Sequence, residues 1–598
     1  MDRKGGWKRF QKLRFDPKVI SRRARRAETA TTRHAHKFVL GRLKNLREAR
    51  EYIASWLLVV AILISAVALQ TFWSQESYSQ SAAVPGGTYA EGMLGPIATL
   101  NPLYAQSDAE LSAVRLIFSS LYDYDSTGHL RGDIATSLTS NREKTSYTVT
   151  IRPDAKWHDG QKVTADDVVF TINLMKNLDA HALMYNSWSG VSAVATNPTT
   201  AQFTLQSPYA LFPQALTFAI LPKHILQKVA PGALSQSTFS ISPVGSGPFQ
   251  LRLLQSTGND TLHKIVNLAR WDNYHHGKAK LERFEIHSYV NATEIVQALK
   301  RRDINAAFDI NDVSGDLSKS ALQTDSYSTG GGVYALFNTQ QTVLSDQSVR
   351  VALQRGADTT KIRQSLSFKP PKLDLPFLPN QVQGVTLPDA LAYDKQAAQQ
   401  SLDKAGWGKG RDGIRYKGNA RLIIHVAHLK NPEYSHVAKM LADQWRQLGI
   451  DVQLNEFNPA TSADQTFAQS VLQPRRYDVL INQLSIGADP DVFPYWHSSQ
   501  ANPFGLNFSN YTNPSADDAL LSARLRDEPE LRAKKYAAFA TQWLQDVPAI
   551  GLYQSTVVYA HTTSTTAITP HTILPTIVDR YSNILYWTTN HAQVYKTP

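Results

Sequence analysis

The sequence predicts a mixed α/β protein with more than one lobe, preceded by a single membrane-spanning helix. At 598 residues the chain exceeds the length at which one hydrophobic core keeps growing, so we expect at least two lobes or domains. Hydrophobic residues make up 42% and charged residues 19%, a balance typical of a globular protein and too polar for a multi-span membrane protein. Strand-like and helix-like segments alternate along most of the chain, which indicates the α/β class.

Residue periodicity and helix-start signals predict the individual strands and helices. Alternating apolar and polar residues predict strands, and apolar residues three and four apart predict helices. The expected strands are 147–152, 284–289, 421–429, 450–457 and 477–484, and the expected helices are 165–178, 292–302 and 434–448. Thr164 and Asp167 fit a capping box at the start of the helix over 165–178.

Residues 53–73 form an uncharged run of about 20 residues, long enough to cross a bilayer core of roughly 30 Å. Basic residues crowd its N-terminal side, whereas residues 74–87 hold one acid and no base. The positive-inside rule therefore predicts a basic cytoplasmic tail over 1–52, a transmembrane helix over 53–73 and an extracellular remainder. Residues 74–85 are expected to be a flexible linker. The alternative is a signal peptide cleaved after Ala68.

The charge of the chain is concentrated in the N-terminal tail. Residues 1–50 hold 17 Lys or Arg and four acids, a net +13, which leaves −1 of the total +12 for the rest. The main body therefore has no overall field to attract nucleic acid, and we do not expect it to bind any. For the tail, contact with anionic lipid headgroups, a solvated topology signal and contact with RNA or DNA stay open as alternatives.

Residues 328–332 contain three consecutive glycines and form the most flexible run predicted in the body of the chain. Glycine adopts backbone dihedrals that other residues avoid, which suits a crossing between two lobes. We therefore place a candidate lobe boundary there, with an ordinary loop as the alternative.

Eight stretches of the chain match a known family in their order and spacing. They are GGTYAEGMLGPIATLNPLYA (86–105), LIFSSLYDYDSTGHLRGDIATSL (116–138), YTVTIRPDAKWHDGQKVTADDVVFTI (147–172), VGSGPFQL (244–251), YALFNT with VRVALQRGAD (334–358), AGWGKGRDG (405–413), ADPD (488–491) and RAKKYAAFATQWLQDVPAIGLYQ (532–554). The most specific part is KWHDGQKVTADDVVF. Together these stretches resemble dipeptide- and oligopeptide-binding proteins of bacterial ABC importers (family 5, cluster C).

The resemblance implies a two-lobed fold like that of periplasmic binding proteins, with an enlarged first lobe that is split in sequence. Carried over to this chain, lobe I comprises 86–328 plus 553–598, and lobe II comprises 329–552. The glycine run then falls at the first crossing between the lobes.

No constellation of residues supports catalysis, so we do not expect an enzyme, a cofactor or a metal site. The sequence shows no nucleophile elbow, HExxH motif or P-loop. Ser246 lies in Gly-Ser-Gly-Pro, which is better explained as a tight turn leading into a strand. His158 and Asp159 fit a turn next to a helix cap, and His275-His276 lack a third ligand nearby in sequence, which favours a surface loop. The chain has no cysteine, which excludes disulfides, thiolate ligands and a lipidated N-terminal Cys.

Residues 486–496 are the best candidate for ligand contact, because they combine carboxylates and aromatic rings in one loop. Asp489 or Asp491 could meet a ligand amine, while Tyr495 or Trp496 covers its apolar part. The alternative for the two acids is a role in turns and caps. Peptide-binding members of the family place an Asp three residues before the Asp-Pro pair to hold a free N-terminus, and here that position is Ile486. The resemblance suggests further cleft-facing candidates, with structural packing as the alternative for each: Asn101, Tyr104, Trp271, Phe337 and Asn338.

The resulting expectation is a receptor held at the cell membrane by residues 53–73, with a large extracellular domain. It would capture a peptide or similarly extended solute between two lobes and deliver it to an ABC transporter permease. The alternative is a non-transporting surface receptor that signals through its helix to the basic tail.

Overall fold

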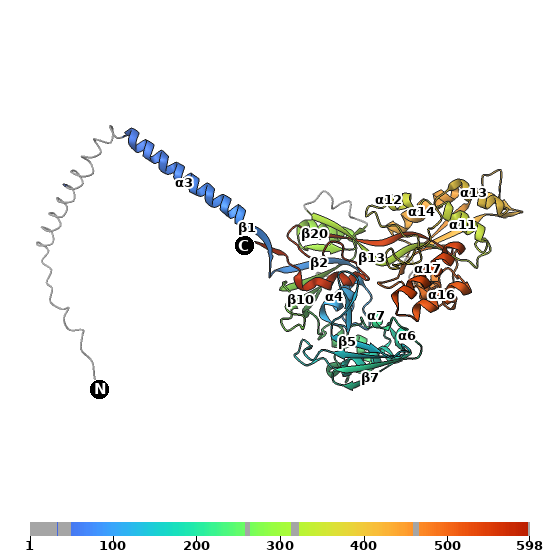
Figure 1. Cartoon of the computed structure of the whole chain (residues 1–598), viewed down its shortest axis with the longest axis horizontal. Helices are drawn as coiled ribbons and strands as arrows, with labels where there is room; N and C mark the ends of the chain where they lie inside the picture. Colours follow the sequence, from blue (N-terminus) through green and yellow to red (C-terminus); the bar gives the residue numbers. More distant parts are fainter. Residues whose placement is uncertain (1–32, 34–49, 257–262, 312–321, 459–465, 596–598) are drawn as a thin grey trace. The chain divides into compact units, whose positions relative to one another are not determined.

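The computed structural model describes residues 33, 50–256, 263–311, 322–458 and 466–595, and it divides into two compact units (Figure 1). One unit comprises Met1–Ala82 with Ala592–Pro598, and the other comprises Ala83–His591. The predicted basic tail lies outside the described residues except for residue 33 and the start of the first described helix.

The first unit contains the helix α3 (Arg50–Tyr78), which includes the predicted membrane span. Within this helix, Tyr52–Trp73 is long and apolar enough to cross a membrane. None of its most apolar stretch is buried against other parts of the described protein. An apolar helix without a protein partner is stable in lipid but not in water. A signal sequence near the N-terminus has the same properties, so a cleaved leader stays the alternative.

The segment after the span differs from the flexible linker expected over 74–85. Helix α3 continues to Tyr78, and β1 (Ser79–Val84) follows and pairs with β21 (Asn590–Tyr595) in a two-stranded sheet. The polar composition of the segment therefore did not exclude regular structure, because its partner strand comes from the far end of the sequence.

The second unit is built around one ten-stranded sheet. Its spatial order is β18-β17-β19-β13-β20-β12-β2-β11-β10-β9. The strands are β2 (Thr88–Leu94), β9 (Phe249–Ser256), β10 (Lys264–Arg270), β11 (Arg283–Tyr289), β12 (Ala306–Phe308), β13 (Leu322–Phe337), β17 (Ile423–Leu429), β18 (Asp451–Phe457), β19 (Val479–Ser485) and β20 (Ala549–Thr562).

Three smaller sheets accompany the large one. A four-stranded sheet has the order β5 (Ala135–Ser140), β6 (Ser146–Ile151), β8 (Thr200–Leu205) and β7 (Val191–Asn197). The others pair β3 (Tyr122–Tyr124) with β4 (Leu130–Gly132), and join β14 (Gly408–Lys409), β15 (Arg415–Lys417) and β16 (Ala420–Arg421).

Helices cover both faces of the large sheet. All the strands and helices predicted from the sequence are confirmed, with bounds shifted by a few residues. The helices are α4 (Asp108–Ile117), α5 (Ala165–Met175), α6 (Tyr185–Trp188), α7 (Phe212–Ala215), α8 (Lys223–Leu226), α9 (Ala292–Arg301), α11 (Gln347–Arg355), α12 (Thr359–Ser365), α13 (Lys395–Lys404), α14 (Pro432–Arg446), α15 (Phe493–Trp496), α16 (Pro514–Arg524), α17 (Pro529–Asp546) and the 3₁₀ segment η8 (Ile577–Tyr586). At the predicted start of α5, the Asp167 carboxylate accepts a hydrogen bond from the Thr164 backbone N–H at 2.8 Å.

Two long antiparallel strands, β13 and β20, run through both halves of the second unit (Figure 1). Residues 322–328 pair with 556–562, and residues 332–336 pair with 549–554. The register shifts between Ser328 and Gly332, so the pairing is interrupted at the predicted crossing. The lobe boundaries at 328/329 and 552/553 fall within these strands and stay a proposal.

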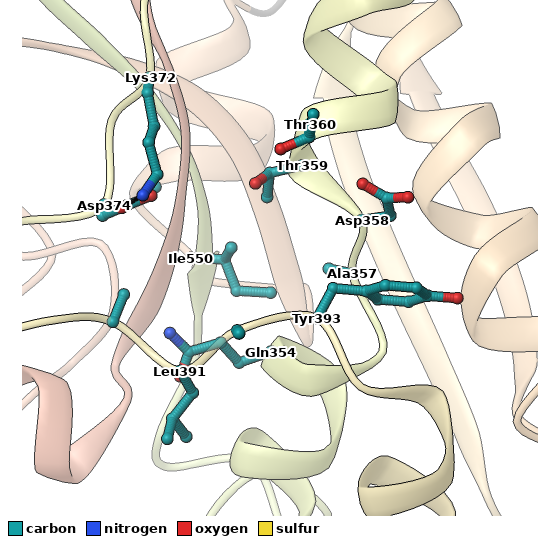
Figure 2. Close-up of a pocket in the computed structure, with 13 residues that line it drawn as sticks. Gln354, Ala357, Asp358, Thr359, Thr360, Lys372, Asp374, Leu391, Tyr393 and Ile550 are labelled. Atoms are coloured by element: carbon teal, nitrogen blue, oxygen red, sulfur yellow. Dashed lines mark ion pairs between the residues drawn. The ribbon is translucent and has the colours of Figure 1, made fainter.

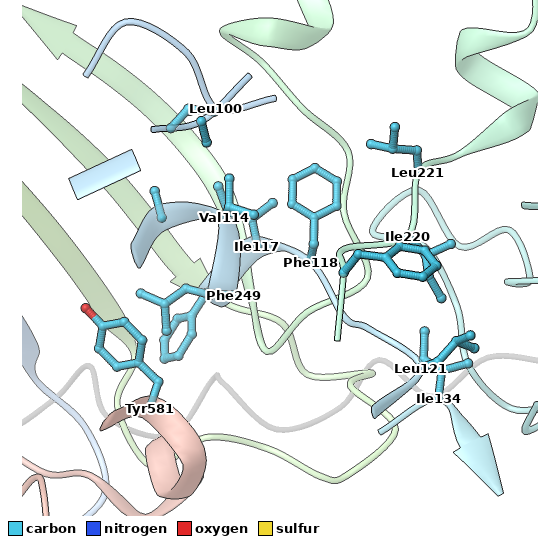
Figure 3. Close-up of a cluster of buried hydrophobic side chains, with 14 of the residues drawn as sticks. Leu100, Val114, Ile117, Phe118, Leu121, Ile134, Ile220, Leu221, Phe249 and Tyr581 are labelled. Carbon is cyan, nitrogen blue, oxygen red and sulfur yellow. The ribbon is translucent and has the colours of Figure 1, made fainter. Parts of the chain in front are cut away.

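Side chains of β13 and β20 alternate between separate hydrophobic cores, as the two-residue period of a strand requires. Val333, Ala335 and Phe337 enter one core, whereas Tyr334 and Leu336 enter the core on the opposite face. The other half of β20 alternates in the same way, with Val557 and Tyr559 on one side and Val558 and Ala560 on the other. Each half of the sheet is therefore stabilised by its own pair of cores. Figure 3 shows part of the largest, where α4 packs against residues from β9 and η8.

The glycine run over 330–332 is a buried part of β13, and the prediction of a flexible segment with unusual dihedrals is wrong. None of these three glycines has a positive φ. They are needed because neighbours approach closely: a Cβ on Gly330 would lie 2.2 Å from the Pro575 carbonyl oxygen, and one on Gly331 would lie 2.6 Å from the Gln483 amide nitrogen. Close backbone approach, and not backbone freedom, explains the motif.

A fully buried ion pair joins the first strand of the large sheet to the C-terminal segment. Arg580 of η8 lies 2.9 Å from the Glu91 carboxylate of β2, and both side chains are 0% exposed. Arg580 also donates to the Ser112 hydroxyl at 2.8 Å and to the Ile577 carbonyl at 2.7 Å. The hydroxyl of Tyr581 donates to the same carboxylate. This network compensates the desolvation of both charges.

We expect Arg580→Ala to lower the free energy of unfolding by about 3–5 kcal/mol, because it leaves the Glu91 carboxylate buried without a cation. Chemical denaturation followed by tryptophan fluorescence measures the change. The matched control is Arg301→Ala, which removes an exposed ion pair with Asp303 and should change stability by less than about 1 kcal/mol. Equal effects of the two substitutions would contradict the assigned role of the buried pair.

Candidate functional site

The predicted ligand loop begins directly after β19 and is tied to the crossing strand β13. The backbone N–H groups of Ile486 and Gly487 both donate to the Gly330 carbonyl at 2.8 Å. Gly487 has a φ of +81°, a conformation in which a side chain would be strained. The loop is therefore fixed where the pairing of the two long strands is interrupted.

Asp489 is held by an arginine of predicted lobe II. The Nη2 atom of Arg532, on α17, lies 2.7 and 2.8 Å from the two Asp489 carboxylate oxygens. The guanidinium also stacks on the Tyr536 ring, and the neighbouring Asp489 charge raises the pKa of Arg532 even though burial opposes the shift. Asp489 thus already has a cationic partner within the protein.

Asp491 lies where residues of the two predicted lobes meet. The Nε atom of Arg524, at the end of α16, is 3.1 Å from the carboxylate, and the Tyr209 hydroxyl donates to it at 3.3 Å. Tyr209 belongs to predicted lobe I, whereas the other two residues belong to predicted lobe II. A second contact between the lobes joins Lys144 to Asp527 at 2.5 Å.

The Arg524 guanidinium lies between two aromatic rings. Its central carbon is 4.7 Å from the Tyr209 ring centre and 4.6 Å from the Phe493 ring centre. The Nε atom is close enough to Asp491 for an ion pair, but its angle does not make a hydrogen bond, and it has no other partner among the described residues. Burial raises the pKa of Asp491 while Arg524 opposes that shift. The acid and the arginine are therefore close but imperfectly paired at the contact between the predicted lobes.

The aromatic residues predicted beside these acids lie in different surroundings. The Tyr495 hydroxyl donates to the Ser485 carbonyl at 2.6 Å, which closes the loop on itself. Trp496 is 0% exposed and packs edge-on against Trp543, with ring centres 5.4 Å apart. Loop closure and core packing account for both placements, and their contact with a ligand stays a prediction.

The five further candidates are dispersed, and the structure does not bring them together at the Asp491 contact. Asn101 is buried and accepts from the Leu103 N–H at 3.1 Å, and the Tyr104 hydroxyl donates to the Ala180 carbonyl at 2.7 Å.

Phe337 is fully buried in the lobe II core. The Asn338 amide donates to the carbonyls of Arg475 and Tyr477, at 3.2 Å each. Packing, the alternative kept for each of these residues, accounts for their positions, and a ligand role for them stays a prediction.

Trp271 belongs to a cluster that contains residues of two of the recognised motifs. Its ring packs edge-on against His158 at 5.0 Å, and its backbone N–H donates to the Pro248 carbonyl at 3.0 Å. His158 Nε2 donates to the Gly247 carbonyl at 3.1 Å, and its Nδ1 accepts from the Gly245 N–H at 3.3 Å. Both ring nitrogens are used in the neutral state, and burial lowers the pKa of His158 to about 4.

We expect His158 to make the folded state less stable under acid conditions. An unfolded histidine titrates near 6.5, so the folded state resists protonation between about pH 6.5 and 4. The stability is fully present above about pH 6.5 and is lost as the pH falls, by about 2 kcal/mol between about pH 7 and pH 5. Denaturation at the two pH values should show this loss in the wild type and a smaller one in His158→Gln. An identical loss in the variant would exclude His158 as its cause.

His275 and His276 lie in a turn, as predicted, but His275 is buried and a third group approaches both rings. Their Nε2 atoms lie 2.8 and 3.2 Å from Oδ1 of Asp133, and the side chains of His275 and Asp133 are 0% and 1% exposed. The third group comes from a position 142 residues earlier in the chain, which sequence spacing could not show.

A separate cavity of about 220 Å³ opens in the helical part of lobe II (Figure 2). None of the nine predicted ligand residues lines it. Its lining residues are Gln354, Ala357, Asp358, Thr359, Thr360, Lys372, Asp374, Ala390, Leu391, Ala392, Tyr393, Ile550 and Gly551.

Tyr209, Arg524 and Arg532 were not predicted from sequence. The sequence held only an indirect signal for the two arginines. Two carboxylates in one buried loop require cations nearby, and α16 and the start of α17 contain arginines. Tyr209 lies 282 residues from Asp491 and carried no signal.

The fold and this site define a two-lobed binding protein of mixed α/β architecture, and the comparisons with known proteins place it in a family. The family model of bacterial extracellular solute-binding proteins, family 5 (middle region), matches residues 129–505, which is more than half of the chain. The chain belongs to this family, whose members are binding proteins and not enzymes.

Individual relatives cover most of the chain. Oligopeptide-binding protein AppA of Bacillus subtilis is 26% identical over 528 residues, covering 85% of this chain and 93% of its own. Its structure in complex with a nonapeptide has a TM-score of 0.68 at 24% identity, over 85% of this chain and 99% of that one. NikZ of Campylobacter jejuni in complex with Ni(L-His) has a TM-score of 0.69 at 24% identity, over 84% and 99%. The two structures show the shared fold.

We expect Arg524→Ala to lower the free energy of unfolding by about 1–3 kcal/mol, because it removes two cation–π contacts and leaves Asp491 without its cation. The matched control is the exposed neighbour Arg526→Ala, which should change stability by less than about 0.5 kcal/mol. Urea denaturation of the two variants measures the difference. Indistinguishable midpoints would show that the Arg524 contacts do not stabilise the folded protein.

Proposed function

We propose that this protein is a membrane-anchored binding protein that captures a peptide or similarly extended solute between its two lobes and delivers it to an ABC transporter permease. The observation that carries the proposal is the meeting of Tyr209 from lobe I with Asp491 and Arg524 from lobe II. These groups are charged or polar and keep hydrogen-bonding capacity at the place where a ligand would touch both lobes.

The nature of the ligand is supported by the relatives and limited by the site. AppA of Bacillus subtilis is an oligopeptide-binding protein and has been solved with a nonapeptide. In this chain Ile486 replaces the acid expected to hold a free amine, and Asp489 is already bound by Arg532. We therefore propose recognition through the peptide backbone and through the Asp491 and Arg524 pair, without a dedicated pocket for a terminal amine.

Attachment to the membrane is assigned to residues 53–73, with the basic tail in the cytoplasm and the second unit outside. The exposed apolar surface of α3 and the basic residues before it support this topology. Anionic lipid is the proposed contact of the tail.

A surface receptor that does not transport is the second candidate, favoured by the 17 basic residues of the first 50. Capture of the full-length protein from solubilised membranes distinguishes them, because a transport protein co-purifies with its permease.

Peptide binding can be tested by thermal denaturation of full-length protein in detergent, after mass spectrometry has shown that it is ligand-free. A nonapeptide library should raise the melting temperature, since ligand at about 100 times its Kd adds about 2.7 kcal/mol of stability. Monosaccharides and metal–histidine complexes serve as comparison ligands. The response to peptide should weaken in Arg524→Ala and persist in Arg526→Ala. Stabilisation by a comparison ligand and not by peptides would contradict the proposed ligand class.

Removal of residues 1–85 tests the anchor. We expect the shortened protein to be recovered in the soluble fraction with its peptide response intact, and the full-length protein to remain with membranes after a high-salt wash. The mass of the mature protein provides the control, because cleavage after Ala68 would remove the helix. A full-length protein released by salt alone, or one that lacks its first 68 residues, would contradict a membrane-spanning anchor.

A further inference from the structure

Three side chains of lobe I direct their donor atoms to one point, away from the ligand loop. Asp133 follows β4, and His275 and His276 lie in the turn after β10. Their donor atoms all lie within 4.8 Å of one another. Nε2 of each histidine approaches the same carboxylate oxygen, at 2.8 and 3.2 Å, and the Tyr274 hydroxyl lies 3.2 Å from it. We propose that Asp133, His275 and His276 bind a divalent transition-metal ion of the zinc type.

The donor set and its geometry fit such an ion. Zinc binds imidazole nitrogen and carboxylate oxygen at about 2.0–2.2 Å, so neighbouring ligand atoms in a tetrahedral site lie roughly 3.3 Å apart. The two nitrogen–oxygen separations, 2.8 and 3.2 Å, need to lengthen by about half an ångström or less, and the two nitrogens start within 4.8 Å of each other. Three protein ligands leave a fourth position for water or the Tyr274 hydroxyl.

The surroundings of Asp133 and His275 are compatible with metal binding. The second Asp133 oxygen accepts from the Ser120 backbone N–H at 3.0 Å, which orients the group. His275 Nδ1 is buried and has no hydrogen-bond partner among the described residues, so no neighbour fixes the tautomer of this ring.

The surrounding charges leave room for a cation. Three arginines and three carboxylates lie around the cluster, so their charges balance, and Asp133 itself adds a negative charge. The surrounding groups are Arg115, Arg131 and Arg152, with Asp123, Asp154 and Asp579, and two of the arginines share Asp123. Arg152 makes a long 3.4 Å contact with His276 Nδ1. This contact would be released on metal binding, because the proton of the neutral ring moves from the ligating Nε2 to Nδ1. Because it already has two hydrogen bonds to Asp154, Arg152 keeps a partner.

Access and position suggest a structural role for the ion. The His276 side chain is 39% exposed, so an ion can enter from solvent, whereas the other two ligands are enclosed. The ion would tie the turn after β10 to the segment between β4 and β5, two parts of lobe I that are far apart in sequence. Neither part includes the Asp491 contact, so this site would stabilise the lobe without touching the captured solute.

The test is a cobalt(II) titration of chelator-treated full-length protein, purified in detergent without a histidine tag. Cobalt(II) reports tetrahedral coordination through its visible d–d absorbance. We expect saturation at one equivalent, competition by zinc, and a higher melting temperature with zinc. His276→Ala should weaken cobalt affinity at least tenfold, while its melting temperature without metal stays close to that of the wild type because the side chain is partly exposed, unlike those of the other two ligands.

His34 and His36 in the tail could bind metal independently, so the control variant carries His34→Ala with His36→Ala. We expect it to retain the absorbance and the zinc-dependent stabilisation. The proposal is overturned by the absence of a saturable band in the wild type, by unchanged cobalt affinity in His276→Ala, or by loss of the signal in the tail variant.

Discussion

The pairing of β13 with β20 is the constraint on which the rest of the structure depends. These strands are the middle of the ten-stranded sheet, and each contributes side chains to cores on both faces and in both halves. The longer of the two breaks in their pairing lies around residues 329–331, where Gly330 accepts hydrogen bonds from the ligand loop and donates to the Leu574 carbonyl. The position of the ligand loop therefore follows directly from the way the two long strands cross.

The electrostatics of the ligand loop limit what the protein can recognise. A buried carboxylate needs a cation, and Arg532 supplies one to Asp489. Both Asp489 oxygens already accept hydrogen bonds from Arg532, so we do not expect this acid to pair with a ligand. Asp491 differs, because Arg524 is close in distance but poorly aligned and is held mainly by the rings of Tyr209 and Phe493. A ligand that supplies both a hydrogen-bond donor and an acceptor, as a peptide backbone does, would pair with both Asp491 and Arg524. This explains how an extended solute could be held although Ile486 replaces the amine-binding acid.

The sequence was sufficient for the architecture but not for the contacts that make the site. Strands and helices such as β11, β18 and α9 follow from residue periodicity, since each buries one face along a short local segment. The prediction for the glycine run is wrong because these glycines are required by the close approach of Pro575 and Gln483, which are distant in sequence. Arg524 with Tyr209, and Asp133 with the two histidines, are likewise long-range pairs. Periodicity and spacing hold no information on such pairs, whereas the buried acids of the loop at least indicated that cations must lie nearby.

The central claim is that a solute is captured by movement of the two lobes about the β13 and β20 crossing. Because the chain has no cysteine, spin labels can be placed at Val194→Cys in β7 and Leu454→Cys in β18, both exposed and in different predicted lobes. Electron–electron double resonance measures their separation in full-length protein with and without the nonapeptide library. The account predicts a shorter and narrower distance distribution with peptide. An unchanged distribution, in protein whose melting temperature rises with the same peptides, would contradict capture by lobe closure.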